Sequence, residues 1–442
     1  MSQFVGQTKR NITNLFKETY KEKMVMDNVI RQDAFLRMVD GMGNHDMGWD
    51  GQDLIVPLKR SRAVSVRVGG YTPDGEIVSQ KYARGAINRA AKLTASMVLE
   101  YEDMEALTGF NKNTMIDIVT DTIENLIQET KEKFSRSIFA GSVVARVVGT
   151  PTTDGVVEVD RIDAFEEGER FLIKKADNTI KEVISGTPNL NTRKVKLTDT
   201  DGSDENLSSY VAGSTIHHPG SLVEATGSTK GNVVWFNSLG GILLPASVNS
   251  SGVVGESNVY GLNKVDHKIL QALSFNSGAS GDFGSTATTA ENFRTRIFAG
   301  LSKVDTLGYG KSAKHLCTSL NNYYVVVNEL DKKQIAYKTA DGIDGQAAIK
   351  FVASGAGACT LEGVRECPDD ILYGLDKKEW RMASQGGLKH VKAKGTDDYF
   401  TIRGNKTEDY KYIRDYRLSG QVWCRAPQNN WTMRGLGKLE VA

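Results

Sequence analysis

The clearest hydrophobic pattern in the chain lies between Asn113 and Gly141. Apolar residues recur there every three or four positions, which places them on one stripe of an α-helix. They are Ile116, Val119, Ile123, Leu126, Ile127, Phe134 and Ile138. Asn113 is suited to cap the first turn and Gly141 to end the last one. Because about 27 helical residues span roughly 40 Å, we expect a spine through an extended body. The spacing does not keep the strict heptad of a coiled coil.

An alternating, strand-like pattern precedes this helix. Residues Leu54 to Val68 are extended, turn-forming residues follow from Gly69 to Gly75, and Glu76 to Ala95 returns to an extended pattern. The pattern predicts a long two-stranded β-hairpin. Its charged residues are mainly basic: Lys59, Arg60, Arg62, Arg67, Lys81, Arg84, Arg89 and Lys92 against Asp53, Asp74 and Glu76. A hairpin with so little apolar surface should lie against another surface.

The chain changes pattern twice after Gly141. From Val143 to about His218, short strand-like runs are separated by glycines and a proline, a spacing typical of a small β-barrel or sandwich. Beyond Trp235, helical patterns at about Ala290 to Leu307 and Asn321 to Asp331 alternate with strand-like runs. These runs are KHLCTSL, IKFV, TLEGVREC and ILYGLD. The chain is therefore predicted to be an α+β protein.

Composition narrows the class of protein. The chain has 442 residues, of which 40% are hydrophobic and 25% charged, as in ordinary globular proteins of two or three domains. Its net charge of +1 gives no strong attraction to nucleic acid. No apolar run is long enough for a membrane helix, and the amino terminus does not resemble a signal peptide. Its four cysteines form no CxxC pair and have no histidine at zinc-ligand spacing, so we expect buried free thiols.

Four features suggest chemistry, and each has a simpler explanation. Gly308-Tyr309-Gly310-Lys311-Ser312 imitates the end of a phosphate-binding loop, but position 305 is aspartate and a helix precedes it. The cluster Asp199, Asp201, Asp204 and Glu205 lacks the remainder of a calcium loop. His217 and His218 are adjacent and poorly placed to share a metal. The run SGAGACTLEG lacks the GxGxxG spacing and is interpreted as a surface loop.

The order of these elements resembles that of a known family. A basic hairpin is followed by KLTASMVLEYEDMEAL, then by a long acidic amphipathic helix ending in FAG, and later by CPDDILYGLDKKEWRMA and DYKYIRDYRLSGQVWCRAP. This order is similar to that of the major capsid proteins of tailed bacteriophages, which have the Hong Kong 97-type fold shared with herpesvirus shells. The resemblance covers most of the chain outside residues 143–232.

The resemblance implies an α+β capsid fold with an inserted small all-β domain. The expected parts are an amino-terminal arm at 1–48, an extended β-hairpin loop at 49–92, and a peripheral domain with the spine helix at 93–142. They are followed by an inserted β-barrel-like domain at 143–232, an axial domain at 233–395, and return strands with the carboxy-terminal tail at 396–442. For residues 9–40, patchily helical, an arm and a helix of the main domain both remain open.

The resemblance also implies the function. We expect a major capsid protein that is not an enzyme, needs no cofactor or metal, and self-assembles into the pentamers and hexamers of an icosahedral virion shell around double-stranded DNA. Its expected partners are itself, a separate scaffolding protein, a portal, decoration proteins and, weakly, the packaged DNA, with no membrane contact. It would be made in the host cytoplasm and reside in the virion capsid. The alternatives are a nucleotide-dependent or hydrolytic enzyme with an accessory β-domain and, from the insertion alone, a surface-binding β-protein.

Candidate contacts between subunits follow from charge. The basic hairpin needs a negative surface, and the chain has one where the hairpin gives way to the spine helix. We expect Arg60, Arg62 and Arg67 of one copy to meet Glu100, Glu102 and Glu105 of another. For covalent cross-linking, known in the type member, Lys59 and Lys81 are the only lysines well inside the hairpin, but the sequence identifies no partner, so noncovalent contacts are expected.

Overall fold

The computed structural model describes residues 54–59, 82–87, 91–100, 125–332, 338–390, 401–403 and 411–439, with gaps inside the longer ranges, the longest at 223–235. The chain divides into two compact units. The first comprises Met1–Gly48, Ala90–Ser135 and Met382–Gln421, and the second comprises Trp49–Arg89, Arg136–Arg381 and Val422–Ala442. The predicted arm at residues 1–48 lies outside the described residues.

The first unit contains most of a four-stranded sheet around the long strand β22 (Lys411–Cys424). Strand β3 (Ala91–Glu100) pairs with it antiparallel, from Ala91 opposite Gly420 to Glu100 opposite Lys411. The short strand β21 (Thr401–Arg403) also pairs with β22, and β20 (Trp380–His390) is its other neighbour in the sheet. Strand β22 lies in the run DYKYIRDYRLSGQVWCRAP, within the region 396–442 where return strands were expected.

The predicted second strand of the hairpin, Glu76 to Ala95, is wrong at its carboxyl end. The hairpin strand β2 (Tyr82–Ile87) ends at Ile87, and Ala91 begins β3, which pairs with β22 instead. Alternation of apolar and polar residues identifies an extended segment but says nothing about which strand will pair with it. Two successive strands with different partners therefore looked like one.

The carboxyl-terminal half of the predicted spine helix is confirmed. Residues 125–126, 128–130 and 132–140 are helical, and Phe134 and Ile138 of its apolar stripe are buried. Gly141 ends the helix as predicted. Its φ is +70°, in the left-handed region that favours glycine, and its N–H donates to the Ser137 carbonyl at 3.1 Å. The first half of the prediction, including the Asn113 cap, lies outside the described residues.

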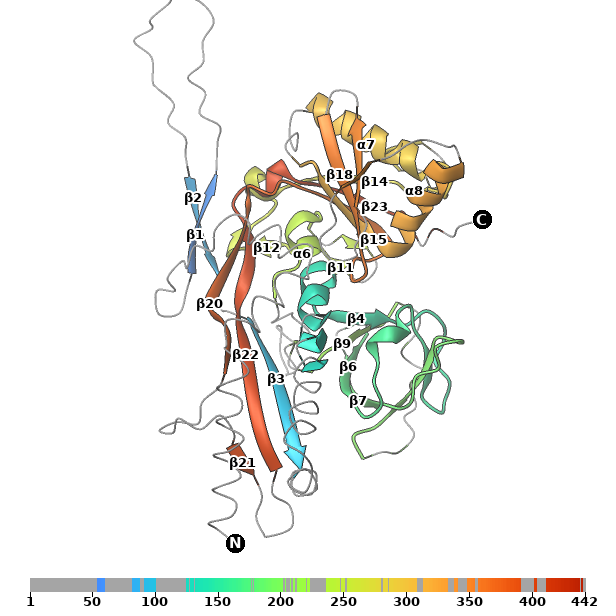
Figure 1. The fold of residues 1–442 in the computed structure, drawn as a ribbon, viewed down its shortest axis with the longest axis vertical. Helices are drawn as coiled ribbons and strands as arrows, with labels where there is room; N and C mark the ends of the chain where they lie inside the picture. The colour runs from blue at the N-terminus through green and yellow to red at the C-terminus, as the bar shows by residue number, and fades with distance from the viewer. Residues whose placement is uncertain are drawn as a thin grey trace, which may run out of the picture. The chain divides into compact units, whose positions relative to one another are not determined.

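Residues 143–217 form a closed six-stranded barrel, seen as the green ring in Figure 1. The strand order is β4-β9-β6-β7-β8-β5, and every pairing is antiparallel. The strands are β4 (Val143–Arg146), β5 (Val156–Glu158), β6 (Arg170–Lys174), β7 (Ile180–Ser185), β8 (Lys194–Thr198) and β9 (Thr215–His217). A bridge between Val147 and Val159 joins the two outer strands, with Val148 N donating to the Glu158 carbonyl at 2.9 Å. Of the two predicted forms, barrel and sandwich, the structure has the barrel.

The barrel is filled by its own apolar residues. Its alternating strands point one set of side chains inward, and these form one cluster drawn entirely from residues 144–216. Phe171, Ile173, Val195 and Leu197 are fully buried or nearly so. Phe165 packs against Phe171 with ring centroids 4.9 Å apart. The barrel thus has a hydrophobic core that depends on no other part of the chain.

The largest sheet of the second unit has seven strands in the order β14-β23-β19-β15-β18-β17-β16. It is mixed, because β14 pairs parallel with β23 and β15 pairs parallel with β18, while the other pairs are antiparallel. The strands are β14 (Leu273–Asn276), β15 (His315–Ser319), β16 (Lys338–Ala340), β17 (Ala348–Ala353), β18 (Gly357–Val364), β19 (Ile371–Leu375) and β23 (Trp431–Arg434).

Two helices pack on this sheet, α7 (Phe293–Leu307) and α8 (Leu320–Lys332) (Figure 1). Both contribute to one core with residues from the strands, so they cover the same face. Arg294 of α7 lies 3.8 Å from Glu329 of α8, which joins the two helices at their edge. Both helices, and the strands predicted with them, are confirmed to within a few residues at their ends.

One prediction in this region is wrong. The run SGAGACTLEG was interpreted as a surface loop, but from Gly357 onward it is strand β18, an inner strand of the sheet. Gly363 is needed in that strand because a Cβ atom there would lie 2.8 Å from the Tyr323 side chain of α8. The glycine therefore marks a close approach of helix and strand. The cysteine prediction is confirmed, since Cys317, Cys359, Cys367 and Cys424 are all buried and free.

The remaining elements of the second unit are short. Helix α6 (Leu239–Leu243) is fully buried, and Ser238 caps it by accepting a hydrogen bond from Gly241 N at 2.9 Å. Two-stranded ribbons follow it, and 3-10 turns stand between some of the longer elements. The ribbons are β10 (Asn249–Ser250) with β11 (Val253–Val254) and β12 (Asn258–Val259) with β13 (Leu262–Asn263). The 3-10 turns are η1 (Ile162–Ala164), η2 (Lys268–Leu270) and η4 (Pro427–Asn429). No helix within the described ranges combines the length and apolar character needed to cross a bilayer.

Candidate functional site

The root of the predicted hairpin is a ladder of two strands, β1 (Leu54–Lys59) and β2 (Tyr82–Ile87) (Figure 1). They pair antiparallel from Leu54 opposite Ile87 to Lys59 opposite Tyr82, and among the described residues they pair with no other strand. One face of the ladder is buried, with Val56 and Leu58 fully enclosed and Ile87 nearly so. Three apolar side chains therefore anchor the root. Residues 60–81 lie outside the described part of the chain.

Tyr260 holds this root in place through hydrogen bonds. Its carbonyl accepts a hydrogen bond from Ala86 N at 2.9 Å, and its hydroxyl accepts one from Cys424 N at 2.7 Å. Gly85 allows this approach, because a Cβ atom there would lie 2.9 Å from the Cβ of Tyr260. One residue thus joins strand β2, through its backbone, to the end of strand β22, through its side chain.

The backbone at Tyr260 is strained. Tyr260 and Gly261 have φ values of +55° and +74°, and they connect β12 and β13 as the two central residues of a tight hairpin turn. A tyrosine in the left-handed region costs roughly 1 kcal/mol relative to glycine. Burial raises the pKa of its hydroxyl, so the group stays protonated. The strain is retained at a residue whose backbone carbonyl and side-chain hydroxyl bind two distant segments.

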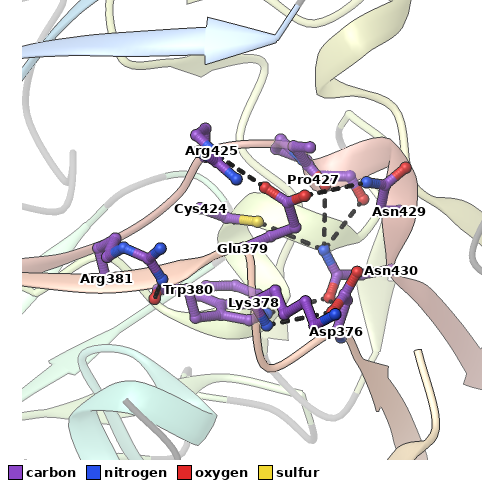
Figure 2. A network of polar contacts seen from close by, with 11 residues as sticks. Asp376, Lys378, Glu379, Trp380, Arg381, Cys424, Arg425, Pro427, Asn429 and Asn430 are labelled. Atoms are coloured by element: carbon purple, nitrogen blue, oxygen red, sulfur yellow. Dashed lines mark hydrogen bonds and ion pairs between the residues drawn. The ribbon is translucent and has the colours of Figure 1, made fainter. Parts of the chain in front are cut away.

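A second junction is centred on Asn430, which is completely buried (Figure 2). Its side-chain oxygen accepts hydrogen bonds from Asp376 N at 2.8 Å and from Trp380 Nε1 at 3.0 Å. Its side-chain nitrogen donates to the carbonyls of Ala426 and Pro427 at 3.2 and 3.4 Å. All four polar positions of the amide are therefore used. The side chain fixes the turn from β19 to β20 against the turn from β22 to β23.

An ion pair closes the same junction. Arg425 Nε lies 3.0 Å from Glu379 Oε2, and Asn429 donates to the other carboxylate oxygen at 3.3 Å. The Arg425 N–H also donates to the Glu379 carbonyl at 2.8 Å (Figure 2). Glu379 is almost fully buried, so its charge requires these partners. Strand β20 begins at this junction and strand β22 ends there, so the junction fixes one end of each strand.

A buried lysine supports helix α6 near the hairpin root. Lys264 Nζ donates to the carbonyls of Gly241 and Leu244 at 2.7 and 2.6 Å, which satisfies the carboxyl end of that helix. Burial lowers the pKa of Lys264 to about 8, while the neighbouring Glu256 raises it. Burial also raises the pKa of the Glu256 carboxyl. The Lys264 ammonium thus has structural partners in two backbone carbonyls.

The enzyme-like candidates find no catalytic setting in the described residues. Helix α7 precedes residues 308–312 and strand β15 follows them, as predicted, which is the reverse of the order in a phosphate-binding loop. Residues 308–312 themselves lie outside the described chain. Asp201 accepts two hydrogen bonds from Ser203 and forms a turn, and Asp204 and Glu205 are not described.

The two histidines are buried in the barrel wall. His217 Nδ1 lies 3.0 Å from Ser142 Oγ, and its Nε2 lies 2.7 Å from Thr215 Oγ1. Burial, together with the charge of Lys174, lowers the pKa of His217 to about 3. The described residues contain no group of three histidine, cysteine or acidic side chains placed to hold a metal ion.

The predicted contact residues remain predictions. Arg60, Arg62, Arg67, Glu102 and Glu105 lie outside the described residues. Glu100 is the last residue of β3, where its backbone is opposite Lys411 of β22. Sequence reasoning missed Tyr260 and Asn430. For Tyr260 the only signal in the sequence was a Tyr-Gly pair between two short extended runs. Asn430 comes three residues after Pro427, where an ordinary turn residue would also be expected.

Comparisons with known proteins give structural similarity only. No protein-family model matches the chain, and no curated protein matches it in sequence. A chain of the cyanophage A-1(L) capsid asymmetric unit is similar in structure, with a TM-score of 0.45 and 11% identity over 90% of this chain and 91% of that one. A chain of the empty GTA particle capsid has a TM-score of 0.39 and 10% identity over 91% and 89%. For a satellite phage P4 procapsid with its size determination protein, the values are 0.38 and 8% over 95% and 100%.

Proposed function

We propose that this chain is the major capsid protein of a tailed bacteriophage or a related particle, and that it assembles into the pentamers and hexamers of an icosahedral shell around double-stranded DNA. The structurally similar chains named above belong to capsids. It acts by binding copies of itself, as a structural protein and not as an enzyme.

One observation supports the proposal most directly: the elements occur in the order that the sequence resemblance implies. A hairpin root is followed by β3, by a helix that ends at Gly141, and later by a mixed sheet and the long strand β22. The root is fixed by one buried face and by Tyr260, so the hairpin begins from a rigid base. An extended arm on a rigid base is suited to reach a neighbouring subunit and keep register with it.

The barrel at residues 143–217 is proposed to be an insertion in this fold, as part of the domain 143–232. Its closed sheet and separate core support this reading, because such a unit adds little to the folding requirements of its host. We extend the proposal to a separate scaffolding protein, a portal and decoration proteins as partners, and to residence in the virion after synthesis in the host cytoplasm.

Electron microscopy of the purified protein tests the function. The full chain should form shells, or rings of five and six subunits, at concentrations where a shortened hairpin does not. Lys59 and Tyr82 are cross-strand partners, so residues 60–81 can be replaced by Asn-Gly, which forms a tight turn between paired strands. The root keeps Val56, Leu58 and Ile87, and the shortened chain should be folded but unable to form shells. A full chain that remains monomeric, even with scaffolding protein co-expressed, would contradict the proposal.

Charge exchange tests the predicted contacts. Reversing Arg60, Arg62 and Arg67 to glutamate should slow or misdirect shell formation, and lysines at positions 100, 102 and 105 should restore part of it. Individual exposed ion pairs contribute only about 0 to 1 kcal/mol, so the effect should appear in assembly rate and accuracy more than in final yield. Light scattering at low and high salt measures it. If the second set of changes gives no rescue, the two surfaces do not meet.

A further inference from the structure

A cavity of about 680 Å³ lies in the second unit between the barrel and the mixed sheet. Barrel residues form one wall, and the end of β15, the start of α8 and the segment that follows β18 contribute to the other. Arg161 connects the walls, because its guanidinium donates to the carbonyls of Arg365 and Glu366 at 3.1 and 3.2 Å. The volume is within the range of roughly 300 to 1,000 Å³ that is typical of ligand-binding pockets.

The cavity is lined by apolar side chains that are open to solvent. Val148 and Leu190 of the barrel are 52% and 67% exposed, and Leu320 at the start of α8 is 36% exposed. Of the described residues, seven large apolar side chains are exposed, and these three all line this one cavity. Exposed apolar side chains scattered singly need no explanation, but a group around a cavity indicates a surface that another molecule covers.

The carboxylates of the cavity already have partners. Asp160 is held by the Arg146 side chain at 3.3 Å and by its N–H at 2.7 Å. Asp369 accepts a hydrogen bond from Asn321 at 3.3 Å. Asp370 accepts hydrogen bonds from Gly437 N and from Ser250 Oγ. The negative charge of the cavity is therefore committed to holding its walls together.

Arg193 differs from these residues. It lines the cavity and is exposed, and among the described residues its guanidinium takes part in no hydrogen bond or ion pair. Its φ is +53°, in the left-handed region that an arginine rarely adopts. Glycine or asparagine would fit the turn with less strain. A strained arginine beside the exposed Leu190 points to a use for its side chain.

We propose that this cavity binds an acidic peptide segment that carries a large apolar side chain and belongs to another polypeptide. The apolar side chain packs among Val148, Leu190 and Leu320, while a carboxylate of the segment receives a two-pronged hydrogen bond from Arg193. The positive charge of Arg193 complements that carboxylate. The cavity's own aspartates would repel a second carboxylate of the peptide if it lay deeper in the cavity. The inference rests on the cavity and not on shell assembly.

Selection from a random peptide display library on the full-length chain tests this without a known partner. Selected peptides should contain at least two acidic residues next to a leucine, phenylalanine or similar side chain. Synthetic copies of the selected peptides are then measured by fluorescence anisotropy. Replacing their acidic residues by amides, or their apolar residue by serine, should each weaken binding at least tenfold. A short oligonucleotide and inorganic phosphate should not displace them, and displacement by either would overturn the proposal in favour of an anion site.

Two variants separate binding from folding. Arg193→Gly should weaken peptide binding at least tenfold without lowering the thermal midpoint, because glycine relieves the strained turn. Leu190→Ser should weaken binding by a similar factor, since Leu190 is already largely exposed and contributes little to the core. Lys194→Ser is the matched control, because it removes a neighbouring exposed positive charge that does not line the cavity. Equal binding by the wild type and Arg193→Gly, or selection of peptides without acidic residues, would overturn the proposal.

Discussion

The barrel and the mixed sheet reach a closed core in different ways. Every strand pair of the barrel is antiparallel, and its core residues all come from 144–216. The core of the mixed sheet draws on residues from Phe275 to Leu439, and one of its two parallel pairs, β14 and β23, places Leu273 opposite Trp431. Contacts between distant residues cost more chain entropy to form. In the mixed sheet, the buried side-chain amide of Asn430 and the close approaches at Gly363 and Gly374 accordingly fix how the strands and their neighbours pack.

The largest effect is expected at the buried junction of the mixed sheet. Asn430→Ala removes the acceptor for Asp376 N and Trp380 Nε1 and leaves both donors buried, which should cost about 4 kcal/mol of unfolding free energy. Urea unfolding followed by tryptophan fluorescence measures this directly, because all five tryptophans lie outside the barrel. The neighbouring Asn429→Ala loses one weaker contact and is the control, expected to cost less than about 1 kcal/mol. Similar losses for both variants would contradict the role given to Asn430.

Gly374→Ala tests the close packing of the same sheet. A Cβ atom at position 374 would lie 2.1 Å from Nε1 of Trp431, which is fully buried and cannot move aside. We expect a loss of about 3 kcal/mol in the same fluorescence assay. Gly149→Ala in the barrel region is the comparison, because its Cβ would meet only the Glu158 side chain, whose nearest atom is the terminal oxygen Oε2 at 3.3 Å. If the two substitutions cost the same, packing does not distinguish the two regions.

The barrel should be the more acid-sensitive region. His217 has a folded pKa of about 3, well below its unfolded value near 6.5, so between these values only the unfolded chain takes up the proton. Its contribution is full above pH 6.5 and is lost as the pH falls toward 3, by up to about 1.4 kcal/mol per pH unit. Hydrogen exchange of the barrel amides at pH 6 and pH 4 measures the loss. The pH slope should be shallower in His217→Asn, and an unchanged slope would show that His217 is not responsible.

The smallest effect is expected when the barrel is removed. Replacing Val143 to Asn232 by a short linker should change the unfolding free energy of the mixed sheet by less than about 1 kcal/mol, because the two cores share no residue. Tryptophan fluorescence again reports the remaining chain. The complementary fragment, residues 141–219, should fold alone with a cooperative transition in circular dichroism. An insoluble shortened chain would show that the mixed sheet depends on the barrel.

Local pattern was enough to predict most elements. Helical spacing and Gly141 predicted the end of the spine helix, and alternation predicted the barrel strands and those of the mixed sheet. The partner of β3 was not predictable, because alternation does not specify pairing. Tyr260 and Asn430 could not be found either, since their importance comes from segments far away in the sequence. The cavity around Arg193 has the same origin, and the charge contacts proposed for the hairpin remain to be tested.

The seat of the hairpin at Tyr260 has a consequence for the order in which the protein is made. Ala86 N reaches the Tyr260 carbonyl and Cys424 N reaches its hydroxyl, so the seat needs residues from the first and the last quarters of the chain. Cys424 is synthesised long after Ala86 and Tyr260. Until then the hairpin root lacks part of its support. A chain that lacks Cys424 would therefore hold its hairpin root less firmly than a chain that includes it.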